Sequence, residues 1–243
     1  MADRLGPMRA VVYHDADAVE EPGGLIGRYL RATGWDVVPV VRAAELPEQV
    51  LRGRGLRSDG SESPIELSVH MGSDSLPSDP ACAELVDPER RAMRAALDAG
   101  VPVLGVCFGA QLLAEVLGGE TGEAPIAEYG LHTHVAADDL CPPGPWVQSH
   151  RHTFTVPAGA RELGHSAAGP QGLAWEGTAR ALGWQFHPEV LPETIRRWGR
   201  EGEQWRSHAD DVVAALLDEK AGLAERSGRL IADAVTWLTG ADA

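Results

Sequence analysis

Apolar and polar positions along the first half of the chain predict alternating strands and helices. Four short apolar runs are typical of strands: 9–13, 36–41, 65–69 and 101–106. Three segments follow the helical spacing of three to four residues: 21–34, 88–99 and 110–117. Because such repeated βα units favour a largely parallel sheet with helices on both faces, the fold class is predicted to be α/β.

Two features refine the expected sheet and its connections. Pro39 places the second apolar run near a sheet edge, because proline cannot donate a hydrogen bond to a neighbouring strand. Residues 42–63 are rich in Arg, Gly, Ser, Asp and Glu. We expect them to form an exposed connection with one helical turn near 47–51.

The second half of the chain changes character twice. Residues 126–182 contain short strand-like runs separated by turns, so we expect additional, partly antiparallel strands there. A helix is then predicted from Pro192, and a second one from about 207 to 238. The apolar face of the second helix either packs on its own domain or forms an interface with a partner or a second copy.

The expected domain organisation follows from that change at residue 191. Residues 1–190 should form the α/β domain, and 191–243 a C-terminal helical extension packed on or beside it.

A cysteine stands between two glycines where the fourth apolar run meets the following helix, in Gly105-Val-Cys107-Phe-Gly109. The glycines let the backbone turn sharply without a side-chain clash, so that the thiol projects from the strand end. The helix N-terminus favours a thiolate, and the N–H of Phe108 can point at an oxyanion beside the sulfur. Cys107 is therefore a candidate nucleophile.

A second apolar segment, 181–187, ends at a histidine that is followed two residues later by a carboxylate. A nucleophilic cysteine needs a base and the base needs an orienting group, which His187 and Glu189 can supply. Pro188 fixes the local backbone so that the carboxylate can turn back toward the imidazole. The order Cys, His, acid differs from that of α/β-hydrolases, whose acid precedes the histidine.

These motifs resemble those of the class I glutamine amidotransferases, whose pattern is a strand, G-x-C-x-G-x-Q and a later F-H-P-E. The resemblance covers most of the chain, including 67–74 and 146–160. It implies a flavodoxin-like open sheet, mostly parallel, with additional antiparallel strands and the helical extension. It also implies a catalytic triad of Cys107, His187 and Glu189, which would hydrolyse the glutamine amide through a thioester without a cofactor.

The same resemblance implies an oxyanion hole built from two backbone N–H groups. One would belong to Phe108. The second would come from the loop after the third strand, from either Gly72 or Ser73. Many relatives have glycine at the position of Ser73, so both donors stay open at this point.

Three further residues match substrate-binding positions of the family: Gln111, His150 and His152. The match is imperfect at the pocket strand. The family usually has aspartate where this chain has His152, and often tryptophan where it has Ser149. Exchanging an anionic group for an imidazole would change how the α-amino group of the substrate is recognised.

Paired histidines occur twice with strand spacing, as His132-Thr-His134 and as His150-Arg-His152. Such pairs place two imidazoles on one strand face, as a metal site requires. Because no third ligand with suitable spacing accompanies either pair, we expect no metal.

Composition narrows the cellular context. The 243 residues carry a formal net charge of −15, which opposes binding to nucleic acid or to anionic membranes. No apolar run approaches the roughly 18–20 residues that span a bilayer, and the N-terminus lacks the apolar stretch of a secretory signal. The three cysteines, Cys82, Cys107 and Cys141, imply no disulfide framework. We therefore expect a cytoplasmic protein.

Three function classes remain after these observations. The favoured one is a glutaminase that supplies ammonia to a separate acceptor synthetase, since no ATP-grasp or phosphate-binding loop is found in the sequence. The alternative is a free-standing hydrolase of a γ-glutamyl amide other than glutamine. A non-catalytic relative is the third class, and the intact Cys, His and Glu argue against it.

Overall fold

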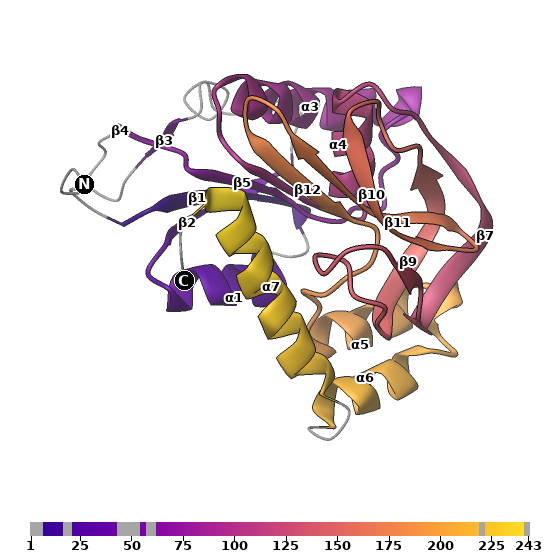
Figure 1. Ribbon diagram of the computed structural model, residues 1–243. Coiled ribbons are helices and arrows are strands. Elements are labelled where there is room, and N and C mark those ends of the chain that lie inside the picture. The colour runs from indigo at the N-terminus through magenta and orange to yellow at the C-terminus, as the bar shows by residue number, and fades with distance from the viewer. Residues whose placement is uncertain (1–6, 17–20, 43–53, 57–61, 219–221, 241–243) are drawn as a thin grey trace.

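The computed structural model describes residues 7–16, 21–42, 54–56, 62–218 and 222–240 (Figure 1). Its centre is an eight-stranded sheet in the order β2-β1-β5-β6-β12-β11-β10-β8. The bounds of these strands are β1 Arg9–His14, β2 Asp36–Val41, β5 Leu67–His70, β6 Val103–Val106, β8 Val135–Ala136, β10 Ala160–Ser166, β11 Gly169–Glu176 and β12 Arg180–Trp184. Strands β2, β1, β5, β6 and β12 run parallel to one another, whereas β11, β10 and β8 are each antiparallel to the strand before them in the sheet. The predicted α/β class with a mostly parallel sheet is confirmed.

Helices cover both faces of the sheet (Figure 1). Their bounds are α1 Gly24–Ala32, α3 Ala83–Asp98, α4 Phe108–Val116, α5 Pro192–Glu201, α6 Ala209–Leu217 and α7 Leu223–Thr239, with short 3₁₀ turns η2 Pro80–Cys82 and η3 Glu203–Trp205. Apolar residues of α1 and α7 pack in one core cluster, and those of α3 and α4 pack in another. The central strand β1 contributes Val12 to the first cluster and Val11 to the second, because successive side chains of a strand point to opposite faces.

Two strands form a separate antiparallel ribbon beside the main sheet, β7 Thr121–His132 and β9 Trp146–Phe154. This ribbon and the antiparallel end of the main sheet are the additional strands that the turn-rich middle of the sequence predicts. A single bridge between Val147 and His187 joins β9 to the segment after β12. The ribbon therefore lies next to the end of β12, where the candidate base stands.

The edge position predicted from Pro39 is confirmed, because β2 is the first strand of the sheet. The connection at 42–63 contains a short hairpin formed by β3 Arg54–Leu56 and β4 Glu62–Pro64. The helical turn expected near 47–51 lies outside the described residues. The described helices include none that is long and apolar enough to cross a membrane.

The prediction of one continuous helix from 207 to 238 is wrong. Helix α6 ends at Leu217, and α7 begins after Gly222, whose φ of 63° is left-handed and starts a new helix. The apolar residues of α7 are buried in the same cluster as those of α1, while α5 and α6 pack around Val147 of β9.

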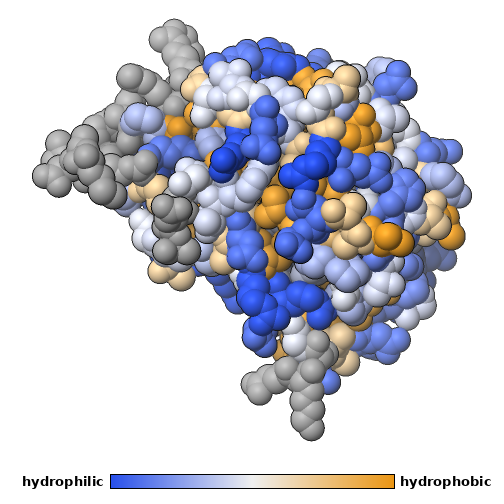
Figure 2. Space-filling view, in the orientation of Figure 1, coloured by the Kyte–Doolittle hydropathy of each residue, from blue (hydrophilic) through white to orange (hydrophobic). Residues whose placement is uncertain are grey.

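Hydrophilic side chains cover most of the face shown in Figure 2, and apolar side chains are scattered between them.

Helix α3 begins five residues before the predicted position 88. The 3₁₀ turn η2 leads directly into it, and this turn is capped by the carboxylate of Asp79, which accepts a hydrogen bond from the N–H of Ala81 at 2.8 Å.

Candidate active site

Cys107 lies between the end of β6 and the first residue of α4. Among the described residues other than glycine, it alone has a positive φ, of 51°. Its N–H donates to the carbonyl of Trp184 in β12 at 2.7 Å, and its carbonyl accepts from Ala110 and Gln111 at 2.9 and 3.0 Å. A strained residue held from both sides in this way is characteristic of a functional position.

The two glycines beside Cys107 have a different role from the one expected. A Cβ on Gly105 would lie 2.5 Å from the carbonyl of Gly109, and a Cβ on Gly109 would lie 2.0 Å from the carbonyl of His70. Neither glycine has a positive φ. They are therefore needed because α4 packs directly on β5 and β6, whereas the sharp turn itself falls on the cysteine.

His187 and Glu189 form a buried pair at the end of β12. Nδ1 of His187 donates to Oε1 of Glu189 at 2.8 Å, while Nε2 has no hydrogen-bond partner among the described residues. The backbone of the pair is fixed as well, since the N–H of His187 donates to Val147 and the carbonyl of Glu189 accepts from Leu25, both at 2.8 Å. The imidazole is thus oriented with its second nitrogen free.

Gly72 lies where the candidate nucleophile and base come together. A Cβ built on it would be 3.0 Å from Cε1 of His187 and 3.7 Å from Cβ of Cys107.

Burial lowers the pKa of His187, but the Glu189 carboxylate and Cys107 raise it more, so that the pKa reaches about 10. The raised pKa favours the protonated form of the imidazole at neutral pH.

The oxyanion donors expected from the sequence lie beside this pair. Phe108 is the first residue of α4, and Gly72 follows β5 by two residues. Ser73 instead uses its hydroxyl locally, accepting from the N–H of Ser75 at 3.1 Å. The contacts of Gly72 place it beside His187, and the role of each donor stays a prediction.

The three predicted substrate residues are connected to one another by hydrogen bonds. Nε2 of Gln111 donates to the carbonyl of His152 and to Oε1 of Gln185, both at 3.2 Å. Both ring nitrogens of His150 are engaged, with Glu128 at 3.1 Å and with the carbonyl of His152 at 3.0 Å. His150 therefore shapes the wall through its hydrogen bonds. Burial and Arg151 lower the pKa of His152, which leaves its ring neutral at pH 7.

Sequence reasoning missed three residues that touch this site. Nε2 of Gln185 lies 3.6 Å from the sulfur of Cys107. The ring of Trp198 in α5 meets the imidazole of His187 edge-on, with centroids 5.3 Å apart. Trp205 in η3 donates from its indole N–H to the hydroxyl of Ser149 at 2.8 Å.

Two tryptophans from the segment after Leu191 thus lie beside the candidate site. Ser149 stands where the family often has tryptophan, and here the indole of Trp205 is bonded to that serine. Trp198 lies in α5 and Trp205 in η3, and their spacing of seven positions is the signal in the sequence that could have pointed to them.

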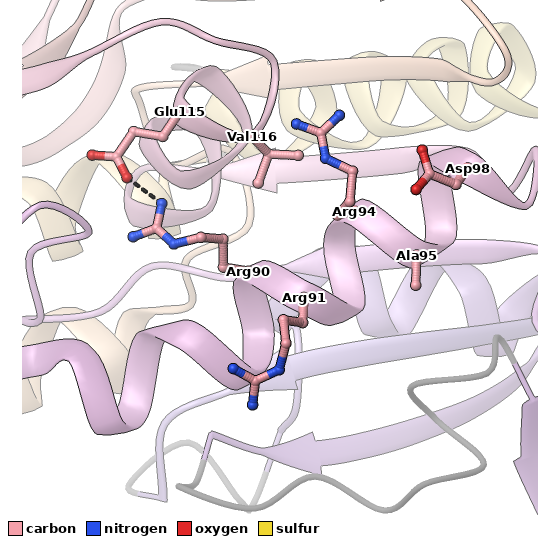
Figure 3. A pocket seen from close by; sticks show the side chains of 7 residues that line it. All are labelled: Arg90, Arg91, Arg94, Ala95, Asp98, Glu115 and Val116. Carbon is pink, nitrogen blue, oxygen red and sulfur yellow. Dashed lines mark hydrogen bonds and ion pairs between the residues drawn. The ribbon is translucent and has the colours of Figure 1, made fainter.

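A surface cavity of about 390 Å³ lies between α3 and α4, away from Cys107 (Figure 3). Its lining residues are Arg90, Arg91, Arg94, Ala95, Asp98, Glu115 and Val116. Arg90 is paired with Glu115 across it, as Figure 3 shows. None of the candidate site residues lines this cavity. In the described part of the chain, no three His, Cys, Asp or Glu side chains are grouped as a metal site would need.

Comparison with known proteins gives consistent matches. The family profile described as "Glutamine amidotransferase class-I" matches residues 76–197, which include all three triad positions. The chain is 32% identical to "GMP synthase [glutamine-hydrolyzing]" from Aeropyrum pernix over 213 residues, covering 80% of this chain and 37% of that protein. It is 35% identical to the protein of the same name from Clostridium perfringens over 101 residues, covering 37% of this chain and 19% of that protein.

The structural matches extend over more of the chain. A glutamine amidotransferase from Thermotoga maritima superposes with a TM-score of 0.74 at 22% identity, covering 92% of this chain and 98% of that one. A second, from Methylobacillus flagellatus, gives a TM-score of 0.71 at 21% identity, covering 96% of each chain. At these identities the two structures show that the fold is shared.

Proposed function

The chain belongs to the class I glutamine amidotransferase family, and from that premise we propose that it hydrolyses the side-chain amide of glutamine. The observation that carries this proposal is the geometry around Cys107. A thiol on a strained turn lies beside an imidazole whose pKa is raised to about 10 by Glu189 and Cys107 against the effect of burial. That arrangement suits a thiolate nucleophile with an acid ready to protonate the leaving group.

The proposed reaction has two stages. The Cys107 thiolate attacks the amide carbon, and N–H groups of Phe108 and Gly72 bind the oxyanion that forms. Nε2 of His187 gives its proton to the departing ammonia, which leaves a thioester. A water molecule then attacks the thioester, the neutral imidazole takes the water's proton, and glutamate departs. Glu189 holds His187 in one orientation throughout.

The catalytic unit that we propose includes the C-terminal extension. Residues 1–190 carry the triad, while 191–243 contribute Trp198 and Trp205 to the wall. Removing the extension would expose one side of His187 to water. Stability and activity are therefore expected to depend on both parts.

The fate of the ammonia is also a proposal. The chain matches between about a fifth and somewhat over a third of the length of the curated relatives named above. Their printed names describe glutamine-hydrolysing enzymes, which supports glutamine as the substrate. We propose that ammonia passes to a separate acceptor synthetase that docks at the strand ends around Cys107.

The test is an assay of the purified chain on glutamine and on a panel of other γ-glutamyl amides. The expected result is weak glutaminase activity, which a cognate acceptor raises and the variant Cys107→Ala abolishes. Rapid turnover of another γ-glutamyl amide with glutamine ignored would instead identify an autonomous hydrolase. Such a result would be explained by Ser149 and His152, which differ from the residues usual in the family at these positions.

A further inference from the structure

A group of buried charges that the reaction above does not use lies beside the oxyanion segments. Arg42, at the residue after β2, has a side chain that is 1% exposed, and so has Glu89 of α3. Nε of Arg42 donates to Glu89 at 2.5 Å, and a second arm of the guanidinium is paired with Asp15. Glu89 also accepts from Nδ1 of His70 at 2.9 Å. We call these four residues the Arg42 cluster.

Arg42 and Glu89 each stabilise the charged form of the other. Burial raises the pKa of Glu89, but Arg42 and His70 lower it more, so the net shift is downward. Burial lowers the pKa of Arg42, but Glu89 and Asp15 raise it more. A buried ionic group is weak evidence for stability, since apolar residues of similar volume often stabilise as well. The role of Arg42 is therefore inferred from the contacts that its guanidinium makes with groups other than the two carboxylates.

Those contacts reach both expected oxyanion donors. Nη2 of Arg42 donates to the carbonyl of Met71 at 3.2 Å. That carbonyl and the N–H of Gly72 belong to one planar peptide unit, in which they point in opposite directions, so fixing the one fixes the other. The guanidinium also lies over the ring of Phe108, 4.5 Å from its centroid.

We propose that Arg42, held by Glu89, is a positioning residue for the oxyanion hole: it sets the direction of the Gly72 N–H and holds the side chain of Phe108, which carries the other donor. A rotation of the Met71–Gly72 peptide would break its hydrogen bond to Arg42, and a shift of Phe108 would break the stacking. The inference rests on the proposed function, because an oxyanion hole matters only if a tetrahedral intermediate forms. It takes Gly72, rather than Ser73, as the second donor, because Gly72 shares its peptide unit with the carbonyl that Arg42 holds.

The test uses Arg42→Lys, which keeps the charge beside Glu89. A lysine ammonium cannot bond Glu89 and Met71 and stack on Phe108 at the same time, because it lacks the planar fork. The matched control is Arg9→Lys. Arg9 is also 1% exposed and paired with a carboxylate, that of Asp36, but it lies at the opposite end of β1 from the site.

The expected result is a fall in kcat of about 10²-fold for Arg42→Lys, with KM little changed, since losing one oxyanion donor costs about 10²–10³. Affinity for an aldehyde analogue of glutamine should fall by a similar factor, because its adduct with Cys107 places an oxyanion in the hole. Alkylation of Cys107 by iodoacetamide needs no oxyanion hole and should keep its rate. Arg9→Lys should behave as wild type in all three.

Two results would overturn the proposal. One is a folded Arg42→Lys variant with the kcat of wild type. The other is an equal loss of kcat and alkylation rate, which would mark a general structural role. The comparison uses whichever γ-glutamyl amide the wild-type chain turns over, so a preference for another amide leaves it intact. If wild type turns over none, the proposed function fails, and this inference fails with it.

Discussion

The two sides of Cys107 are held in different ways. On the oxyanion side, Arg42 grips a backbone carbonyl and stacks on Phe108 through a buried ionic cluster. On the base side, His187 is held by one carboxylate and by a T-shaped contact with the ring of Trp198 in α5. One side is thus fixed by charged groups with a specific geometry, and the other by one ion pair and packing.

The difference predicts how each side responds to substitution. Removing one partner from a buried ionic group leaves a charge without compensation, so the response is abrupt. Removing aromatic packing costs contact area in proportion to what is lost, so the response is graded. On the base side, we therefore expect a large loss of activity on substitution of Glu189 and smaller losses on substitution of the aromatic residues around it.

The largest effect is expected for Glu189→Gln. The variant keeps the shape of the side chain but removes the charge that raises the pKa of His187, so less imidazolium is present to protonate ammonia. General acid–base catalysis contributes about 10²–10⁴ in rate, and kcat should fall within that range. Steady-state kinetics on glutamine would measure it, and a loss below tenfold would contradict the role given to Glu189.

The next effect is a pH dependence of stability. Folding raises the pKa of His187 from 6.5 to about 10, so stabilisation by the imidazolium is complete below about pH 6.5. It is lost as pH rises through about 10. The Tm of wild type should therefore fall more between pH 7 and pH 10 than that of Glu189→Gln, by calorimetry at fixed ionic strength. Parallel curves for the two proteins would show that the pair adds nothing to stability.

A smaller effect is expected for Trp198→Leu. Leucine keeps an apolar contact but removes the ring edge that packs against the imidazole, so His187 gains freedom. We expect kcat to fall by roughly tenfold, which corresponds to about 1.4 kcal/mol. The control is Trp237→Leu in α7, a half-buried tryptophan remote from the site. Equal losses in the two variants would assign the effect to the fold in general.

The smallest effect on catalysis is expected for Ser149→Ala. The substitution leaves the buried indole N–H of Trp205 without its acceptor, which should cost about 1–3 kcal/mol of unfolding free energy. Denaturant unfolding would measure it, and the KM for glutamine should change little. A large rise in KM would mean that the serine hydroxyl itself contacts the substrate.

The strands and the helices around the elbow could be predicted because each depends on residues close together in the sequence, and local motifs also single out the three residues that the fold brings together, Cys107, His187 and Glu189. Cys107 is recognised from its flanking glycines and His187 from the Pro and Glu that follow. The same local logic failed at Gly222, where a glycine within an apolar pattern begins a new helix. A left-handed glycine is not visible in periodicity.

The two supports of the site could not be predicted because they depend on long-range contacts. Arg42 meets a carboxylate 47 residues away, and Trp205 meets a hydroxyl 56 residues away. In the sequence, Arg42 is one of several charges in what reads as an exposed connection. In the folded chain its side chain is buried, and its guanidinium stacks on the ring of Phe108.

The central claim is that Cys107 is the nucleophile, and labelling with a diazo-ketone analogue of glutamine tests it most directly. Cys141 is buried, and burial raises the pKa of its thiol, which disfavours reaction there. Cys82 is half-exposed, so its thiol competes with Cys107 for the analogue. Peptide mapping by mass spectrometry should find one label per chain, on Cys107, and glutamine should protect against it. A label on Cys82 or Cys141, or none, would contradict the account.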